Sequence, residues 1–277
     1  CSSDLRVKHT SAASLIVCVL GSNVLGIPVV WHSEENMYVP QLVFGYLYTS
    51  SNYSDGDAEG KDTAGREKGG RNGLGAKLAN MFATRFRVDC LDSRRRKRFR
   101  MEWENNMRTR RAPVVTDVVP KRGSPARDYT EISFVPDLQR FGMTRLDKDI
   151  VALLTRRVYD IAGCHPTVRV TLNKRQIKLG GFQAYVRLYL NSGRRSGDPV
   201  VPHVFRRIDD RWSVCVARSE RGLGFQQVSL VNSVYTAGGG VHVDLARSSL
   251  WRQLAPIIDG KNKGGEEVTR EEIIEHV

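Results

Sequence analysis

Alternation of apolar and polar residues predicts several β-strands in the first two thirds of the chain. The clearest is the run in which Phe86, Val88 and Cys90 alternate with charged residues, because successive side chains on a strand point to opposite faces. The apolar run at 14–20 is typical of a short buried strand. Further strands are expected over 167–172 and around Ile132 and Phe134.

Apolar residues at helical spacing predict three helices in the same part of the chain. One begins at Pro40, where the missing N–H of proline costs nothing. A second begins near Gly75, and its apolar face is expected to hold Leu78, Met81 and Phe82. A third is introduced by Thr144 and Asp147, which resemble an N-cap arrangement, and it carries Leu146, Ile150, Leu153, Leu154 and Val158.

The sequence Lys-Leu-Gly-Gly at 178–181 predicts a boundary between two domains. After it, the pattern favours a helix from Phe182, strands over 212–217 and 227–234, and a last helix that Pro256 is expected to kink. Residues 1–14 show no convincing period. We therefore expect an unassigned segment (1–14), a first domain (15–180) and part of a second domain (181–277).

Between 50 and 70 almost nothing apolar occurs, which predicts a long loop of about twenty residues, a length more often functional than idle. The loop runs into Gly-Gly-Arg-Asn-Gly-Leu-Gly-Ala-Lys at 69–77. Glycines let backbone N–H groups approach an anion, and the helix that follows presents unpaired N–H groups at the same place. Arg71 and Lys77 can add charge-assisted hydrogen bonds of about 1.5–3 kcal/mol each. The pattern predicts a phosphate-binding loop; the alternative is a solvated loop before a helix.

Two common phosphate-binding motifs do not fit this loop. A Walker A motif starting at Gly70 would need lysine directly after Gly75, where Ala76 stands, and a Ser or Thr after Lys77, where Leu78 stands. A dinucleotide-binding fingerprint would need an apolar strand leading directly into the glycines. The sequence therefore predicts a phosphate-binding loop of another type.

Six short motifs lie along the chain between about Ile16 and Gly265. They are Met37-Tyr38-Val39-Pro40, Thr49-Ser50-Ser51-Asn52-Tyr53, Gly69 to Lys77, Leu146 to Leu153, Phe225-Gln226-Gln227 and His242-Val243-Asp244. In this order they resemble the ATPase region of eukaryotic type II DNA topoisomerases. Each motif alone is weak, but six in the order of the family make the resemblance specific, and it covers most of the chain.

The resemblance implies an α+β fold: a two-layer α/β sandwich ATPase domain of the gyrase, chaperone, histidine-kinase and mismatch-repair class, followed after about Gly180 by part of an α/β transducer domain. It implies ATP and Mg²⁺ as ligands, double-stranded DNA as partner, a homodimer that closes through this region, no membrane, and a nuclear location, with an organellar one left open. The implied activity is ATP-driven passage of one DNA duplex through another. The residues that it assigns to ATP are Ser22, Asn23, Ser50, Ser51, Asn52, Gly70, Arg71, Asn72, Gly73, Leu74, Gly75, Ala76 and Lys77.

The chain also departs from the family pattern. Ser22 stands where a residue that reads the adenine amino group is expected, Val24 replaces a glycine and Leu74 replaces a tyrosine. The family's general-base glutamate and its magnesium-binding asparagine have no counterpart in 1–14. Because the chain also begins at Cys1, we expect a fragment or processed form that does not hydrolyse ATP alone. Two alternatives are a degenerate ATPase-like module that binds DNA without turnover, and a misjoined gene product whose residues 1–14 belong elsewhere.

The charge balance favours a polyanionic partner. The chain carries 43 Lys and Arg against 30 Asp and Glu, a formal net charge of +13, which points to nucleic acid. The basic run containing Arg94, Arg95 and Arg96 is interpreted either as a contact surface for the phosphate backbone or as a solvated hairpin edge. Lys261 and Lys263 remain from a lysine run that contacts DNA in the family.

Other chemistry is not favoured by the sequence. The five cysteines form no C-x-x-C pair, which argues against a disulfide framework or a cysteine zinc site and fits a reducing compartment. The histidines lack metal-ligand spacing and no G-x-S-x-G elbow occurs. The longest apolar run near the start, Leu15 to Leu20, is too short to cross a membrane.

Overall fold

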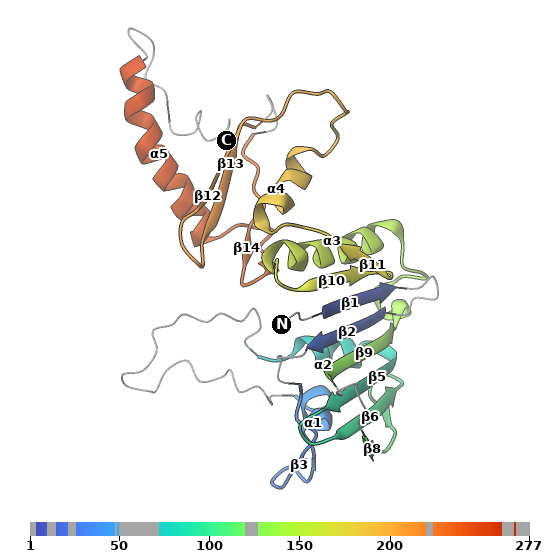
Figure 1. The fold of residues 1–277 in the computed structure, drawn as a ribbon. Coiled ribbons are helices and arrows are strands. Elements are labelled where there is room, and N and C mark those ends of the chain that lie inside the picture. Colours follow the sequence, from blue (N-terminus) through green and yellow to red (C-terminus); the bar gives the residue numbers. More distant parts are fainter. Residues whose placement is uncertain are drawn as a thin grey trace. The chain divides into compact units, whose positions relative to one another are not determined.

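The computed structural model describes residues 4–9, 15–21, 26–47, 49, 72–119, 127–219, 224–261 and 269. The chain divides into two compact units, which we call unit 1 (Cys1–Lys178) and unit 2 (Leu179–Val277). Unit 1 contains a large sheet with helices, and unit 2 contains two small hairpins and two helices (Figure 1).

Unit 1 is built on a nine-stranded sheet in the order β11-β10-β1-β2-β9-β5-β6-β7, and β8 also pairs with β6. All of these pairs are antiparallel except β1 with β10, which is parallel. A separate two-stranded ribbon joins β3 and β4. The strands are β1 (Asp4–His9), β2 (Leu15–Gly21), β3 (Trp31–His32), β4 (Met37–Tyr38), β5 (Ala83–Asp92), β6 (Lys97–Glu104), β7 (Thr109–Arg110), β8 (Val114–Asp117), β9 (Asp128–Pro136), β10 (Arg169–Leu172) and β11 (Arg175–Ile177).

The sheet confirms the predicted strands and corrects the reading of the first residues. The expected strands at 14–20, 85–90, around Ile132 and Phe134, and at 167–172 correspond to β2, β5, β9 and β10. The segment 1–14, left unassigned, contains β1. Its alternation is short, with Leu5 and Val7 alternating with Arg6 and Lys8, and its pairing with β2 and with the distant β10 holds it in the sheet.

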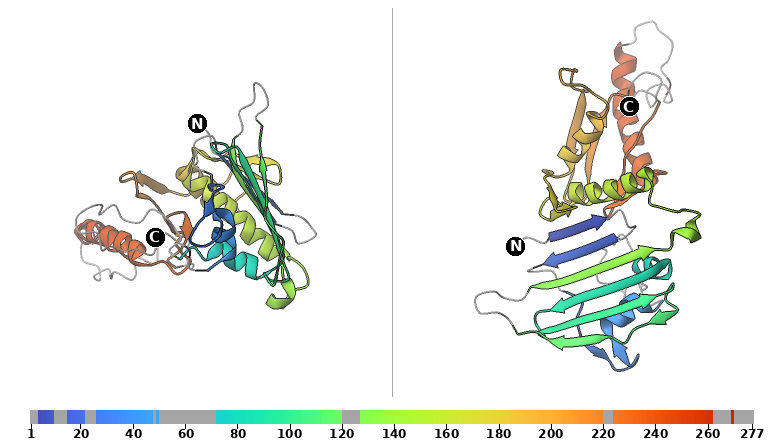
Figure 2. Two further views of the ribbon diagram at one scale, coloured as in Figure 1. Left: turned by 90° about the horizontal axis from the view of Figure 1, so that it is seen from below. Right: turned by 90° about the vertical axis from the view of Figure 1, so that its right-hand side faces the viewer.

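Three α-helices belong to unit 1: α1 (Val39–Gly45), α2 (Gly75–Met81) and α3 (Lys148–Cys164), together with a short 3₁₀ helix, η1 (Leu138–Phe141). The three α-helices lie on one side of the sheet (Figure 2). Helix α1 begins one residue before Pro40, which stands in its first turn. Helix α3 is capped by Asp147 and not by Thr144: the Asp147 carboxylate accepts the Ile150 N–H at 2.9 Å, as expected of an aspartate at this position.

The core of unit 1 lies between the helices and the sheet, where β5 and β6 meet α1 and α2. Strand alternation sets much of its composition. On β6 the buried residues Phe99, Met101 and Trp103 recur at every second position, and on β5 the core residues Phe86, Val88 and Cys90 have the same spacing, although residues 89, 91 and 92 are buried as well. Phe86, for example, packs against the rings of Phe44 on α1 and Phe134 on β9. The fully buried cluster consists of Val29, Phe44, Ala83, Phe86, Val88, Cys90, Phe99, Met101 and Trp103.

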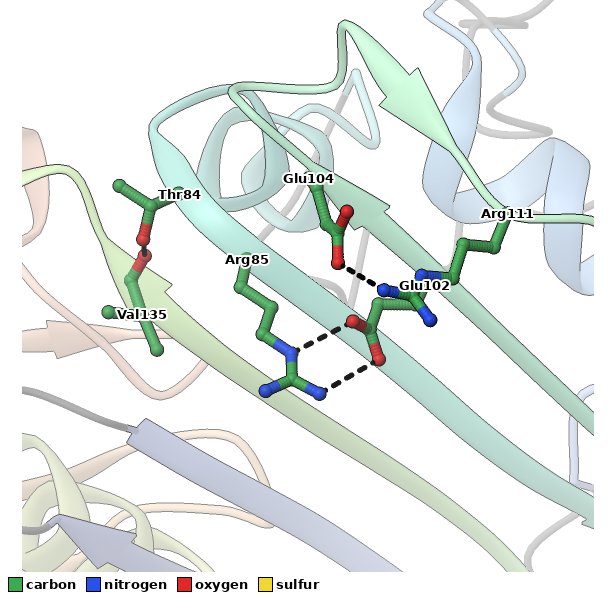
Figure 3. A network of polar contacts seen from close by, with 6 residues as sticks. All are labelled: Thr84, Arg85, Glu102, Glu104, Arg111 and Val135. Carbon is green, nitrogen blue, oxygen red and sulfur yellow. Dashed lines mark hydrogen bonds and ion pairs between the residues drawn. The ribbon is translucent and has the colours of Figure 1, made fainter.

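The opposite face of the same strands is charged. Arg85 on β5 makes two hydrogen bonds to the carboxylate of Glu102 on β6, at 2.9 and 3.2 Å, and Arg111 reaches Glu104 at 2.8 Å (Figure 3). Cross-strand pairs of opposite charge stabilise a sheet face that is open to water. The sheet therefore has an apolar helix-covered face and a polar face on which arginines pair with carboxylates.

Unit 2 contains α4 (Phe182–Leu190), α5 (Val241–Lys261) and two hairpins, β12 (His203–Arg207) with β13 (Ser213–Ala217) and β14 (Leu230–Val231) with β15 (Val234–Tyr235). The expected single strand at 227–234 is wrong. Asn232 and Ser233 have φ angles of 50° and 65°, so the chain reverses there in a tight turn. Helix α5 contains Pro256 and ends at Lys261. Among the described residues, no helix is long and apolar enough to span a membrane.

Candidate functional site

The glycine loop leads directly into helix α2 of unit 1. Of the residues assigned to ATP, the structure describes Asn72, Gly73, Leu74, Gly75, Ala76 and Lys77. Gly73 has a φ of 60°, a conformation that glycine adopts without strain, and the helix begins at Gly75. Outside the described residues lie Ser22, Asn23, Ser50, Ser51, Asn52, Gly70 and Arg71.

Helix α2 buries a different face from the one its apolar residues predict. Leu78 is 44% exposed, whereas Lys77 and Asn80 are 2% and 1% exposed. Ala76 and Ala79 pack against the core beside them. Small residues allow the helix to approach the core closely, and the two polar side chains then need partners inside the protein.

Lys77 finds such a partner at the end of the segment that follows α1. Its Nζ donates a hydrogen bond to Thr49 Oγ1 at 2.7 Å, and Thr49 Oγ1 lies 3.4 Å from the Tyr46 carbonyl oxygen, to which it can donate. No carboxylate pairs with Lys77 among the described residues. Burial lowers the pKa of the Lys77 ammonium, because removing a charge from water disfavours its ionised form.

Asn80 makes the second polar contact of this helix face. Its Nδ2 donates to the Phe44 carbonyl oxygen at the end of α1, at 3.1 Å, and its Oδ1 is buried without a partner among the described residues. Lys77 and Asn80 stand three residues apart and therefore lie on one side of α2. Together they tie the helix after the loop to the segment before it.

Gly75 leaves open space at the start of α2. A Cβ placed on it would meet no atom of the described residues within 4 Å, so packing in the described part of the chain does not require glycine there. Open space at the start of α2, two residues before an ammonium that pairs with no carboxylate among the described residues, fits an anionic ligand that approaches the backbone closely. These residues can accommodate a phosphate group.

A second cluster of polar contacts holds the segment 26–29 at the end of the sheet. Asp128, the first residue of β9, accepts the Gly26 N–H at 3.3 Å and the Ser93 N–H at 2.6 Å with its two oxygens. Asp92, the last residue of β5, accepts the Val29 N–H at 3.0 Å and the Arg95 N–H at 3.0 Å. We call these two aspartates the carboxylate clamp. Nothing in the local sequence pattern singles them out.

The basic run lies partly in the turn 93–96 between β5 and β6. Arg94, Arg95 and Arg96 are all exposed. Arg95 also pairs with Asp92 at 2.9 Å, whereas Arg94 and Arg96 make no ion pair within the described part of the chain. Lys261 is exposed at the end of α5, and Lys263 lies outside the described residues.

One buried carboxylate stands on the charged face of the sheet. Asp89 on β5 accepts two hydrogen bonds from Arg98, at 2.9 and 2.6 Å, and one from Tyr129 at 2.8 Å, with Arg87 at 3.6 Å. Burial by itself favours the neutral acid, but these hydrogen bonds and charges outweigh it, so the pKa of Asp89 lies below its ordinary value.

Comparison with known proteins gives close relatives and similar structures. The chain is 42% identical over 244 residues to a protein of Dictyostelium discoideum named probable DNA topoisomerase 2, covering 88% of this chain and 15% of that protein. The crystal structure of the ATPase region of Saccharomyces cerevisiae topoisomerase II matches with a TM-score of 0.83 at 35% identity, over 99% of this chain and 65% of that one. The ATPase domain of Thermus thermophilus gyrase B has a TM-score of 0.58 at 17% identity, over 98% of this chain and 67% of that one, which supports the fold alone. No family model matches the chain.

These matches confirm the expected fold class, a mixed α and β ATPase-type fold. The chain spans only a small part of the length of the curated relatives that it matches. Sequence reasoning singles out the glycine loop and Lys77, but not the contacting residues Thr49, Asn80, Asp92 and Asp128. The position of Thr49 in the Thr-Ser-Ser-Asn-Tyr motif is a sequence signal by which it could have been found. Asn80, Asp92 and Asp128 have no such signal, because each makes contacts with residues that are distant in sequence.

Proposed function

The chain belongs to the family of eukaryotic type II DNA topoisomerases, and on this premise we propose that it is the ATP-binding region of such an enzyme. In the proposed role, ATP binding closes a homodimer through this region and drives passage of one DNA duplex through another. We also propose a nuclear location for the whole protein. The alternative of a degenerate module is less favoured, because the identity extends along most of the chain.

The observation that carries the ATP assignment is the state of Lys77. A buried ammonium with only a hydroxyl partner is costly unless an anion neutralises it. Among the described residues the Lys77 ammonium has only the Thr49 hydroxyl as its hydrogen-bond partner, and Lys77 stands two residues after Gly75, where the helix begins with open space around the backbone. A nucleotide phosphate supplies the missing negative charge.

Within the proposal, the described residues of the loop have separate roles. The backbone from Asn72 to Ala76 approaches the phosphates, and Lys77 neutralises them at short range. Ser22 and Asn23 at the base, Ser50, Ser51 and Asn52 at the ribose and nearby phosphate, and Gly70 and Arg71 in the loop stay predictions from the resemblance. No catalytic base is assigned to this chain.

ATP normally binds to proteins together with Mg²⁺. In nucleotide sites it is held largely by the phosphates and water. Across the described ranges, no three His, Cys, Asp or Glu side chains gather closely enough to hold a metal ion. The described residues therefore form no metal cage of their own, and no step is assigned to the ion.

Calorimetry with a non-hydrolysable ATP analogue tests this function. We expect Lys77→Met and Gly75→Val each to weaken binding at least tenfold, since one removes the charge and the other fills the space that the phosphates need. Lys148→Met is the matched control, because Lys148 is an exposed lysine at the first residue of α3. Equal affinity in the wild type and both variants contradicts the phosphate assignment.

The basic turn supports a second proposed contact, with double-stranded DNA. Arg94 and Arg96 are exposed without an ion pair among the described residues, as an arginine that meets phosphates from solution should be. Arg95, Lys261 and Lys263 complete the set of proposed DNA contacts. The absence of a base-reading motif leads us to expect binding that does not depend on DNA sequence.

A further inference from the structure

Asn72 and Gly73 form the only Asn-Gly pair in the sequence. Both residues are exposed and lie outside the helices and strands, in the bend that leads into α2. Because glycine has no Cβ, its backbone nitrogen can approach the side-chain amide of the preceding asparagine with little steric hindrance. The bend before α2 therefore holds an asparagine whose side chain can react with its own backbone.

The backbone nitrogen of Gly73 is available for such a reaction. Its N–H donates no hydrogen bond within the described part of the chain. Gly73 has a φ of 60°, and glycine moves between positive and negative φ at little cost, so the peptide unit can reorient. The exposed pair Asn191 and Ser192 differs in both respects, because serine has a Cβ and the Ser192 N–H donates to the Tyr189 carbonyl oxygen at 3.0 Å.

The reaction open to this pair is deamidation. The Gly73 backbone nitrogen forms a bond to Asn72 Cγ, the bond from Cγ to Nδ2 breaks, and the side-chain nitrogen leaves as ammonia with the proton of the Gly73 amide. The succinimide ring that results takes up a water molecule at either of its carbonyl carbons. The product is aspartate or isoaspartate, and water is the only co-reactant.

We propose that Asn72 is a spontaneous deamidation site and that its conversion to aspartate or isoaspartate stops the glycine loop from binding phosphate. The loop from 69 to 77 contains no Asp or Glu, so the product places a negative charge where phosphates are expected, and like charges repel. Isoaspartate also adds a carbon atom to the backbone, which displaces the N–H groups that approach the phosphates. This inference rests on the proposed ATP-binding function.

Bound nucleotide should slow the reaction. In the proposed function the backbone from Asn72 to Ala76 approaches the phosphates, and a Gly73 N–H that donates to a phosphate oxygen is held away from Asn72 Cγ. A ligand that binds only the intact, ordered loop lowers the population of the reactive conformations. Deamidation therefore inactivates the molecules that remain without nucleotide.

Peptide mass spectrometry measures the reaction while the protein is incubated in mildly alkaline buffer. We expect the Asn72 amide to be lost at least about tenfold faster than the Asn191 amide, which is the internal control. A saturating non-hydrolysable ATP analogue should slow the loss at Asn72 at least about fivefold and leave Asn191 unchanged. In calorimetry, the fraction of protein that binds the analogue or inorganic tripolyphosphate should fall in step with the loss of the Asn72 amide.

Two variants of the same position complete the experiment. Asn72→Asp reproduces one product and should bind both probes at least about tenfold more weakly than Asn72→Gln, which has a neutral side chain. Asn72→Gln would have to close a larger ring to lose its amide, so it should keep its own starting affinity through the same incubation.

The outcomes separate this inference from the function on which it rests. If Asn72 loses its amide no faster than Asn191, the modification site is wrong. If the loss is fast but phosphate binding does not fall with it, or the bound analogue does not slow it, the link to the phosphate loop is wrong. If fresh wild type binds neither probe, the proposed function fails and the effect on binding fails with it, whatever the rate at Asn72. Thermal unfolding of aged and fresh samples shows that the affinities are those of folded protein.

Discussion

Two buried charges on opposite faces of the same sheet differ in their partners. Asp89, on the charged face, is 4% exposed and is met by Arg98, Arg87 and Tyr129. Lys77, on helix α2, is similarly buried, but among the described residues its ammonium has only the hydroxyl of Thr49 as a hydrogen-bond partner. Desolvation opposes the charged form of both groups. At Asp89 the hydrogen bonds and nearby positive charges outweigh desolvation, so the pKa of Asp89 falls below its usual value. At Lys77 desolvation prevails, so the pKa of the ammonium is lowered and it is easier to deprotonate.

The difference separates a structural charge from one that fits a ligand. Loss of a partner from a buried, fully paired carboxylate destabilises a fold, whereas removal of a buried charge that lacks a counter-ion can be neutral or stabilising. By this criterion Asp89 belongs to the framework of the sheet. Lys77, which pairs with no carboxylate among the described residues, is the group that we propose to meet the anion.

The largest expected effect is on stability and comes from Asp89→Asn. The substitution leaves Arg98 without its carboxylate, and we expect the free energy of unfolding to fall by about 2–3 kcal/mol, less than for a fully buried pair because Arg98 reaches water. Binding of the ATP analogue should not change. Denaturant unfolding and calorimetry measure the two quantities, with the exposed Asp117→Asn as control. If nucleotide binding weakens while stability stays the same, Asp89 serves the ligand and is not the structural charge of the pair Asp89 and Lys77.

The same carboxylate predicts how stability depends on pH. The pKa of Asp89 is lower in the folded protein than in the unfolded chain, so its contribution is complete above the ordinary carboxyl pKa near 4 and is lost as the pH falls through the folded value. The wild type should therefore lose stability relative to Asp89→Asn only in acid. A difference between the two proteins that stays constant from pH 7 down to about pH 2 contradicts this account.

The opposite pattern is expected of Lys77→Met. Binding of the ATP analogue should weaken by about ten- to a hundredfold, the equivalent of one charge-assisted hydrogen bond. The unfolding free energy should stay the same or rise slightly, because a buried unpaired charge is replaced by an apolar chain of similar length. Unfolding and binding are measured on the same preparation. A large loss of stability would make Lys77 a structural residue like Asp89.

A smaller effect is expected for charges that are exposed rather than buried. Replacing Arg94 and Arg96 together by Ala should lower the slope of log affinity for duplex DNA against log salt by up to about 1.8, at about 0.9 per phosphate contact. Arg95 is left in place because it holds Asp92. Titrations on two unrelated duplexes should change alike. An unchanged slope identifies the turn as a solvated hairpin edge and leaves Lys261 and Lys263 as candidates.

The smallest effect is expected at Leu78. Because this side chain is largely exposed on α2, Leu78→Ala should change the unfolding free energy by no more than about 0.5 kcal/mol. The buried neighbour provides the contrast: Asn80→Ala removes the hydrogen bond to Phe44 and should cost about 1–3 kcal/mol. A larger loss of unfolding free energy for Leu78→Ala than for Asn80→Ala would show that α2 buries the face that its apolar pattern predicts.

Features that depend on local pattern can be predicted from the amino-acid sequence. Alternation located β5, β9 and β10, helical spacing located α2, α3 and α4, and the glycines marked the loop before α2. The order of six motifs was enough to identify the family that the relatives confirm. These features are readable because each is encoded within a few consecutive residues.

Tertiary structure alone decided which polar groups are buried and with what they pair. Leu78 is expected inside on amphipathic grounds, yet it is Ala76 and Ala79 that pack closely against the core, and Lys77 and Asn80 are buried beside them. The partners of Asp128 and Asp92 lie on strands and turns far along the chain. A periodic pattern reports only how one segment divides its own residues between two faces. The free energy of a buried polar group depends instead on atoms that distant segments bring to it.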